Sequence, residues 1–269
     1  MPRSRSEDSS ASVRTSSPRP LLKSWPAISR RVQAAEGVAL FLDFDGTLVD
    51  FQPRPDQVKL AVRTSAALRK LTAIPNVRVT IVSGRRRSSL LRFIKVRKLR
   101  VSGLYGWEHQ EGIILAGPAM RQVSRIRKLL ATLERELPGI YVEDKGISFA
   151  VHFRDASQEV VGKAQRMLSK FLPRFRAYMR IIRAGNVWEL TPRHVRGKGP
   201  AIRTLLRELP AKFLSFYVGD DLTDEPAFRA LGKGISVVVG SRRPTNAYFS
   251  LPNPIAVCKF LELLSRELA

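Results

Sequence analysis

Two aspartates, Asp43 and Asp45, follow an apolar run of strand length at residues 38–42, and Gly46 comes directly after them. Such a run is typical of a strand buried on both faces of a parallel sheet. Open α/β sheets bind their ligands at the carboxyl ends of their strands. Unpaired carboxylates placed there repel each other and are costly to bury, and a bound Mg²⁺ would resolve that conflict. The simpler alternative is an Asp-Gly turn.

Three other places in the sequence carry matching chemistry. Ser83 ends a second predicted strand, Lys198 opens a helix, and Asp220 and Asp221 end a later strand. Each of these is weak evidence for a catalytic site on its own. Ser-Gly is a common pair in loops, Lys198 is one of 47 lysines and arginines, and the aspartates could cap a helix. Because parallel strands end at one edge of a sheet, we expect all of them to share a pocket with Asp43.

This set of residues suits phosphoryl transfer. Asp43 is ionised at neutral pH and could attack a phosphate monoester, giving an aspartyl-phosphate that water then hydrolyses. Asp45 would protonate the leaving alcohol and later take a proton from water. Ser83 would donate a hydrogen bond to a phosphoryl oxygen, and Lys198 would offset negative charge.

The same aspartates predict a metal site. Asp43, the backbone carbonyl of Asp45 and Asp220 would supply the oxygen ligands that Mg²⁺ prefers. Asp221 or Asp224 would orient those ligands or their waters.

The apolar pattern predicts an α/β fold, a doubly wound parallel sheet. Strands are predicted at 38–42, 77–81, 99–104, 213–218 and 235–239. Helices are predicted at 56–73, 197–209 and 255–268, and a further helix is predicted to begin at about Asp224 with Thr223 as its N-cap.

The pattern changes in the middle of the chain. Helices at 118–137 and 157–172 and strands at 140–142, 147–153, 178–183 and 187–190 predict a smaller α+β module of two antiparallel β-α units. We therefore divide the chain into a disordered basic tail (1–34), a core (35–112 and 193–269) and an inserted α/β cap (113–192).

Composition narrows the function classes. The net charge of +24 is spread along all 269 residues without interleaved aromatic residues, which disfavours specific nucleic-acid binding. No apolar run approaches the about 18 residues that span a membrane. The single cysteine, Cys258, allows no internal disulfide and fits a cytoplasmic setting. We expect a monomer whose partner is a small sugar phosphate.

The motifs resemble those of the haloacid dehalogenase-like (HAD) phosphohydrolases. Asp43-Phe44-Asp45-Gly46-Thr47 is similar to the first motif, Ser83 to the second, Lys198 to the third and Gly219-Asp220-Asp221 to the fourth. The resemblance implies that Asp43 is the nucleophile, that Asp45 is the acid and base, and that a cap is inserted after the second motif.

Within that superfamily, the chain resembles the trehalose-6-phosphate phosphatase family from about residue 36 to its end. Three segments carry the resemblance: GDDLTDEPAF at 219–228, EDKGISFAVHFR at 143–154 and GNVWELTP at 185–192. It implies a Mg²⁺-dependent enzyme that releases trehalose and phosphate, with sugar hydroxyls bound by Glu143, Lys145 and Glu189. We also place Gly84, Arg85 and Asn186 in the substrate site.

Two positions depart from that family, and other functions stay open. Asn186 stands where many relatives have Lys, and Tyr105 where a His is common; both are expected near the sugar. The alternatives are a phosphatase for another sugar phosphate (sucrose or mannosylglycerate phosphate), a sugar-phosphate phosphotransferase, and a non-enzymatic module that binds nucleic acid through its basic surface.

Overall fold

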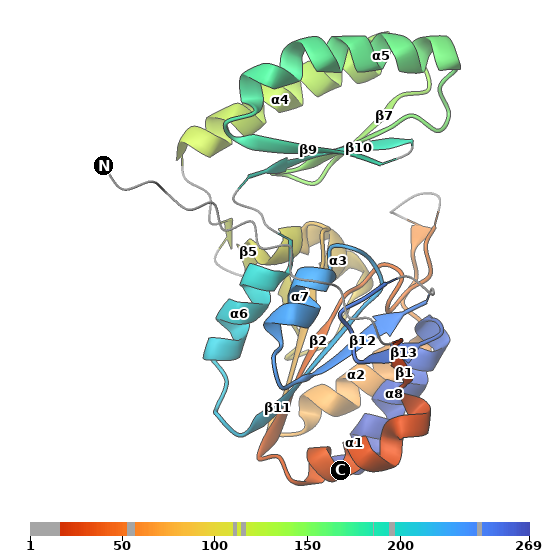
Figure 1. Ribbon diagram of the computed structural model, residues 1–269, viewed down its shortest axis with the longest axis vertical. Coiled ribbons are helices and arrows are strands. Elements are labelled where there is room, and N and C mark those ends of the chain that lie inside the picture. Colours follow the sequence, from red (N-terminus) through yellow and green to blue (C-terminus); the bar gives the residue numbers. More distant parts are fainter. Residues whose placement is uncertain are drawn as a thin grey trace.

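The computed structural model describes residues 17–52, 57–109, 112–113, 117–184, 186–193, 197–240 and 244–269. These residues form a larger part built on one sheet and a smaller part built on another (Figure 1). No helix in the described residues combines the length and apolar character needed to cross a membrane.

The sheet of the larger part has seven strands in the order β1-β13-β12-β11-β2-β3-β4, and all neighbouring strands are parallel. Its strands are β1 (Arg19–Pro20), β2 (Gly37–Leu42), β3 (Val77–Val82), β4 (Arg100–Ser102), β11 (Phe213–Gly219), β12 (Ile235–Val239) and β13 (Phe249–Leu251). β2 and β11 lie side by side at its middle. Their carboxyl ends therefore lie at the same edge of the sheet.

Helices cover both faces of this sheet. Leu40 of β2 packs into one apolar core with α1 (Trp25–Gln33), α2 (Val62–Ala73), α3 (Arg87–Phe93) and α8 (Pro254–Glu267). Phe41, the next residue, packs into a second core with α6 (Gly199–Arg207) and α7 (Glu225–Ala230). This alternation along one strand explains why the run 38–42 is apolar throughout. The predicted doubly wound parallel sheet is confirmed.

The smaller part, which we call the inserted module, spans residues 117–192. Its antiparallel sheet has the order β7-β8-β10-β9, from β7 (Tyr141–Asp144), β8 (Phe149–His152), β9 (Met179–Ala184) and β10 (Val187–Pro192). Val151 and Trp188 pack beneath α4 (Gly117–Glu136) and α5 (Gln158–Phe171). Glu143 and Glu189 are both opposite Ala150, so they share the other sheet face, which is turned toward the larger part (Figure 1).

The remaining described elements are short. They are the single-turn helices η1 (Leu22–Ser24), η3 (Leu104–Gly106) and η4 (Leu172–Phe175), and the two-residue strands β5 (Glu108–His109) and β6 (Gly112–Ile113). The η3 turn directly follows β4 at the carboxyl edge of the large sheet. It therefore lies beside the residues expected to do chemistry.

The amino-terminal segment corrects the prediction of a disordered tail up to residue 34. Residues 1–16 lie outside the described residues, but β1 pairs with β13, and η1 and α1 follow it. Leu21, Ile28 and Val32 are buried in the core of the larger part. Residues 28 and 32 are one helical turn apart, so a small number of well-spaced apolar side chains holds this segment despite its polar composition.

Two helix starts also differ from the prediction. α2 begins at Val62 rather than at 56, and Val58 reaches the core from a segment without regular secondary structure; residues 53–56 lie outside the described residues. α7 begins at Glu225, with Asp224 and not Thr223 at its N-cap position. Thr223 instead donates from its amide and hydroxyl to Asp221 Oδ1.

Candidate active site

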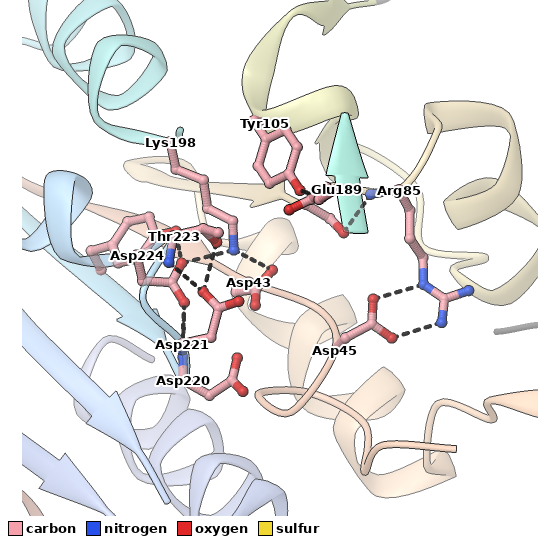
Figure 2. Close-up of polar contacts among 12 residues, drawn as sticks. Asp43, Asp45, Arg85, Tyr105, Glu189, Lys198, Asp220, Asp221, Thr223 and Asp224 are labelled. Atoms are coloured by element: carbon pink, nitrogen blue, oxygen red, sulfur yellow. Dashed lines mark hydrogen bonds and ion pairs between the residues drawn. The ribbon is translucent and has the colours of Figure 1, made fainter. Parts of the chain in front are cut away.

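The ends of β2 and β11 bring Asp43 and Asp220 together (Figure 2). Asp43, Asp220 and Asp224 each offer a carboxylate oxygen, and the three oxygens lie within 4.8 Å of one another. Gly46 has a φ of +72°, and a Cβ at this position would overlap the carboxylate of Asp220. The glycine after the two aspartates is therefore required both by its backbone conformation and by close packing.

Lys198 joins this cluster from the start of α6. Its side chain is buried, and Nζ lies 2.7 Å from Oδ1 of Asp43 and 2.7 Å from Oδ1 of Asp224. Burial alone would lower the pKa of Lys198, but the charges of Asp224 and Asp43 outweigh it and raise that pKa. The lysine is therefore a permanent cation between the two carboxylates.

Asp224 organises the loop that follows β11. Its side chain is fully buried. Oδ1 accepts from Lys198 and, at 2.6 Å, from the Tyr217 hydroxyl, while Oδ2 accepts from the amides of Asp220 at 2.9 Å and Asp221 at 3.1 Å. Both oxygens are thus engaged by protein donors, which suits a residue that orients its neighbours better than one that binds a cation directly.

Negative charge exceeds positive charge in this cluster. Burial, together with the charges of Asp224 and Asp220, raises the pKa of Asp43 well above its ordinary value, although Lys198 opposes the shift. Burial and the charges of Asp224 and Asp221 raise the pKa of Asp220 to about 7. Buried carboxylates with this excess charge, offering only hard oxygen atoms, fit a divalent cation such as Mg²⁺.

Asp45 lies beside this cluster and forms a bidentate ion pair with Arg85. Nε and one terminal nitrogen of Arg85 donate to Oδ2 and Oδ1 of Asp45, each at 2.7 Å (Figure 2). The guanidinium lies over the rings of Phe44 and Phe93, 5.6 and 5.7 Å from their centroids. Both charged residues were expected in the site, but no local pattern predicts their pairing, because they are 40 positions apart.

The loop after β3 places Ser83 and Gly84 next to η3. Ser83 is buried, and its Oγ accepts from the amide of Arg85 at 3.2 Å. The amide of Tyr105 donates to Ser83 O and that of Leu104 to Arg85 O, both at 2.8 Å. The ends of β3 and β4 are therefore tied to each other by backbone hydrogen bonds.

A second group of charges lies on the inserted module. Lys145 Nζ is 3.3 Å from Oε1 of Glu189 and 3.8 Å from Oε2 of Glu143, and His152 Nε2 is 3.5 Å from the same Glu143 oxygen. Burial would raise the pKa of Glu143, but His152 and Lys145 lower it. Burial would likewise lower the pKa of Lys145, but Glu143 and Glu189 raise it. Glu143 and Lys145 are therefore held in their charged forms.

Asn186 is placed apart from these residues. It lies exposed in the turn between β9 and β10, and its backbone oxygen accepts from Phe153 N at 2.8 Å. Within the described ranges, its side chain makes no hydrogen bond to the charged group on the module. Its assignment to the substrate site remains a prediction.

The structure adds two tyrosines that sequence reasoning had not placed in hydrogen-bond networks. Tyr217, inside the apolar strand β11, donates to Asp224, and Tyr105 donates to Oε1 of Glu189 at 2.6 Å. The only sequence signal for Tyr217 was its hydroxyl group within an otherwise apolar strand, because a buried tyrosine hydroxyl needs a hydrogen-bond partner. Tyr105 links the larger part to the inserted module.

Comparison with known proteins identifies the family. A model of the trehalose-phosphatase family matches residues 41–254. The chain is 31% identical over 286 aligned residues to the trehalose-phosphate phosphatase of Mycobacterium tuberculosis, covering 97% of this chain and 70% of that protein.

The chain belongs to the trehalose-phosphatase family.

Solved structures agree on the fold of this family. The C-terminal domain of C. albicans trehalose-6-phosphate phosphatase matches with a TM-score of 0.76 at 20% identity, covering 94% of this chain and 99% of that one. The Aspergillus fumigatus trehalose-6-phosphate phosphatase matches with a TM-score of 0.64 at 24% identity, covering 93% and 99%. At these identities the likeness concerns the fold alone.

Proposed function

We propose that this protein hydrolyses trehalose 6-phosphate to trehalose and inorganic phosphate through an aspartyl-phosphate on Asp43. Membership of the trehalose-phosphatase family supports the substrate. The observation that carries the chemistry is the contact of buried Lys198 with Asp43 at 2.7 Å, beside Asp220. This contact holds a carboxylate oxygen in place next to a fixed positive charge, as attack on a phosphate dianion requires.

The reaction has two steps in this proposal. An oxygen of Asp43 bonds to phosphorus while the bond from phosphorus to the sugar oxygen breaks, and Asp45 gives its proton to that oxygen. Asp45 then takes a proton from a water molecule that attacks the phosphorus of the aspartyl-phosphate, so that phosphate leaves and Asp43 is restored. Ser83 donates to a phosphoryl oxygen. Arg85, which is paired with Asp45 in the structure, turns to the incoming phosphate, and the freed carboxylate takes up a proton from solvent before it acts as the acid.

Mg²⁺ completes the site in this proposal. Asp43, the backbone carbonyl of Asp45 and Asp220 would hold it, while Asp224 and Asp221 orient the loop that carries Asp220. When bound, the ion neutralises the carboxylates and the phosphoryl oxygens, so that they can approach each other. A cytoplasmic location and a monomeric state stay predictions.

The inserted module acts as a cap over the sugar in this proposal. Glu143, Lys145 and Glu189 lie on its face toward the larger part and would bind sugar hydroxyls. In this proposal the cap spans residues 113–192. The core spans residues 35–112 and 193–269, together with residues 19–34, which form β1, η1 and α1. Closure of such a module excludes bulk water and adds selectivity.

Phosphate release from a panel of sugar phosphates tests the proposed substrate. With Mg²⁺ present, kcat/KM for trehalose 6-phosphate should exceed that for sucrose, mannosylglycerate and glucose phosphates by at least about 100-fold, because the polar cap face penalises sugars that leave its groups unpaired. Equal turnover of these substrates would contradict the assignment. Isomerised sugar phosphate in place of free phosphate would indicate a phosphotransferase.

The metal site predicts a pH dependence of stability. Asp220 has a pKa of about 7 in the folded protein, whereas an unfolded aspartate titrates near about 4. Between these values the folded chain holds a proton that the unfolded chain has released, so the free energy of unfolding should fall as pH rises through this window. Mg²⁺ should remove most of that fall, because it stabilises the charged form.

Urea unfolding at about pH 5 and about pH 7.5, with EDTA or with Mg²⁺, measures this effect. Asp220→Asn, which cannot titrate, is the matched control and should lose the part of the difference that Asp220 contributes, while the raised pKa of Asp43 keeps the rest. A metal-free protein as stable at the higher pH as at the lower one would contradict the predicted site.

A further inference from the structure

Tyr105 connects the two parts of the protein by a short hydrogen bond. The residue belongs to η3, at the carboxyl end of β4, and its buried hydroxyl donates to Oε1 of Glu189 on β10 at 2.6 Å (Figure 2). One partner thus comes from the edge that carries the catalytic aspartates and the other from the inserted module.

The position of this hydroxyl is fixed from the side of the large sheet. The backbone amide of Tyr105 donates to Ser83 O at 2.8 Å, and the residue adopts the left-handed conformation, with φ of 60° and ψ of 24°. Its ring lies directly on Gly84, where a Cβ would come within 3.0 Å of two ring carbons. The hydroxyl is therefore held at a set place relative to Ser83 and Gly84, at the phosphate end of the proposed site.

The hydroxyl in turn orients Glu189. Oε1 of Glu189 accepts from Tyr105 and also lies 3.3 Å from Nζ of Lys145. Two donors engage both lone pairs of that oxygen, which fixes the plane of the carboxylate and hence the direction of Oε2. Burial and the charge of Glu189 raise the pKa of Tyr105 well above its ordinary value, so the tyrosine remains a donor at neutral pH.

We propose that Tyr105 is a positioning residue that sets the span between the phosphate end and the sugar end of the site by orienting Glu189. This inference rests on the proposed function, in which Glu189 binds a sugar hydroxyl. A site whose polar groups are fixed in direction discriminates strongly against ligands that cannot pair with them. Tyr105 therefore favours a sugar phosphate long enough to reach the module over a small phosphate ester.

Tyr105→Phe tests this role, because it removes the hydroxyl and keeps the ring on Gly84. KM for trehalose 6-phosphate should rise by about tenfold, as expected for a lost hydrogen bond to a charged group, while kcat stays within about threefold. Turnover of p-nitrophenyl phosphate, which has no sugar to reach Glu189, should be unchanged. Tyr105→His, which offers a ring N–H donor, should give a KM between those of the wild type and of Tyr105→Phe.

A double-mutant cycle separates positioning from a general structural effect. If Tyr105 acts through Glu189, Tyr105→Phe should change KM by less than about twofold when Glu189 is already alanine. Tyr248→Phe is the matched control, since Tyr248 is exposed at the amino end of β13, at the opposite edge of the sheet, and should leave both substrates unaffected.

Three results would overturn the inference: an unchanged KM for trehalose 6-phosphate in Tyr105→Phe, equal losses on the sugar phosphate and on p-nitrophenyl phosphate, or additive effects in the cycle. Failure of the proposed function would give a different result: the wild-type protein would turn over trehalose 6-phosphate no better than other sugar phosphates. The same comparisons made with the sugar phosphate that the wild type prefers then decide the role of Tyr105.

Discussion

Asp43→Asn is expected to lower kcat for phosphate release by about 10⁴-fold or more, because a neutral amide oxygen cannot form the acyl phosphate. The fold should persist. The amide that replaces the carboxylate still offers an oxygen to Lys198, and Lys198 keeps its 2.7 Å contact with Asp224. Burial and neighbouring carboxylates already make the charge of Asp43 unfavourable in the folded state, so its removal costs little stability.

Single-turnover assays with a phosphate sensor, combined with urea unfolding, measure both parts of this prediction. Asp50→Asn is the matched control: Asp50 lies on the same segment but is exposed, and its replacement should leave kcat unchanged. The nucleophile assignment would be wrong if Asp43→Asn kept more than about a tenth of the wild-type rate.

Asp224→Asn is expected to lower the free energy of unfolding by about 3–5 kcal/mol, the usual cost of breaking a buried ion pair. The carboxylate accepts from four donors on Lys198, Tyr217, Asp220 and Asp221. An amide places two hydrogens where one of its oxygens stood, so it cannot satisfy donors on both sides. Lys198 would also lose the largest of the carboxylate charges that keep it buried as a cation.

Equilibrium unfolding in urea gives this value directly. Asp221→Asn is the control from the same loop; Asp221 is exposed and accepts from Thr223, so its loss should cost no more than about 1 kcal/mol. Similar losses in the two variants would show that the loop, and not the buried network of Asp224, determines stability.

Much of the fold could be predicted because local sequence patterns indicate the strands and helices. The run at 38–42 is apolar at every position, as a strand between two helical layers must be, and β2 occupies it. The helix predicted at 118–137 and α4 agree closely because its apolar residues recur at helical spacing. Segments held by a small number of long-range contacts were missed: β1 exists because it pairs with β13, 230 residues later by its register, Arg19 with Phe249.

The sequence by itself determined the chemistry: which carboxylates, lysine and serine are available, and at which strand ends they stand. Strand ends are set by local apolar patterning, and the topology of a parallel sheet then brings Asp43, Lys198 and Asp220 to one edge. Only the tertiary structure decided how those groups are paired. Arg85 engages Asp45 across 40 residues and Tyr105 engages Glu189 across 84, and such contacts depend on side-chain direction and distance in space, which no local pattern encodes.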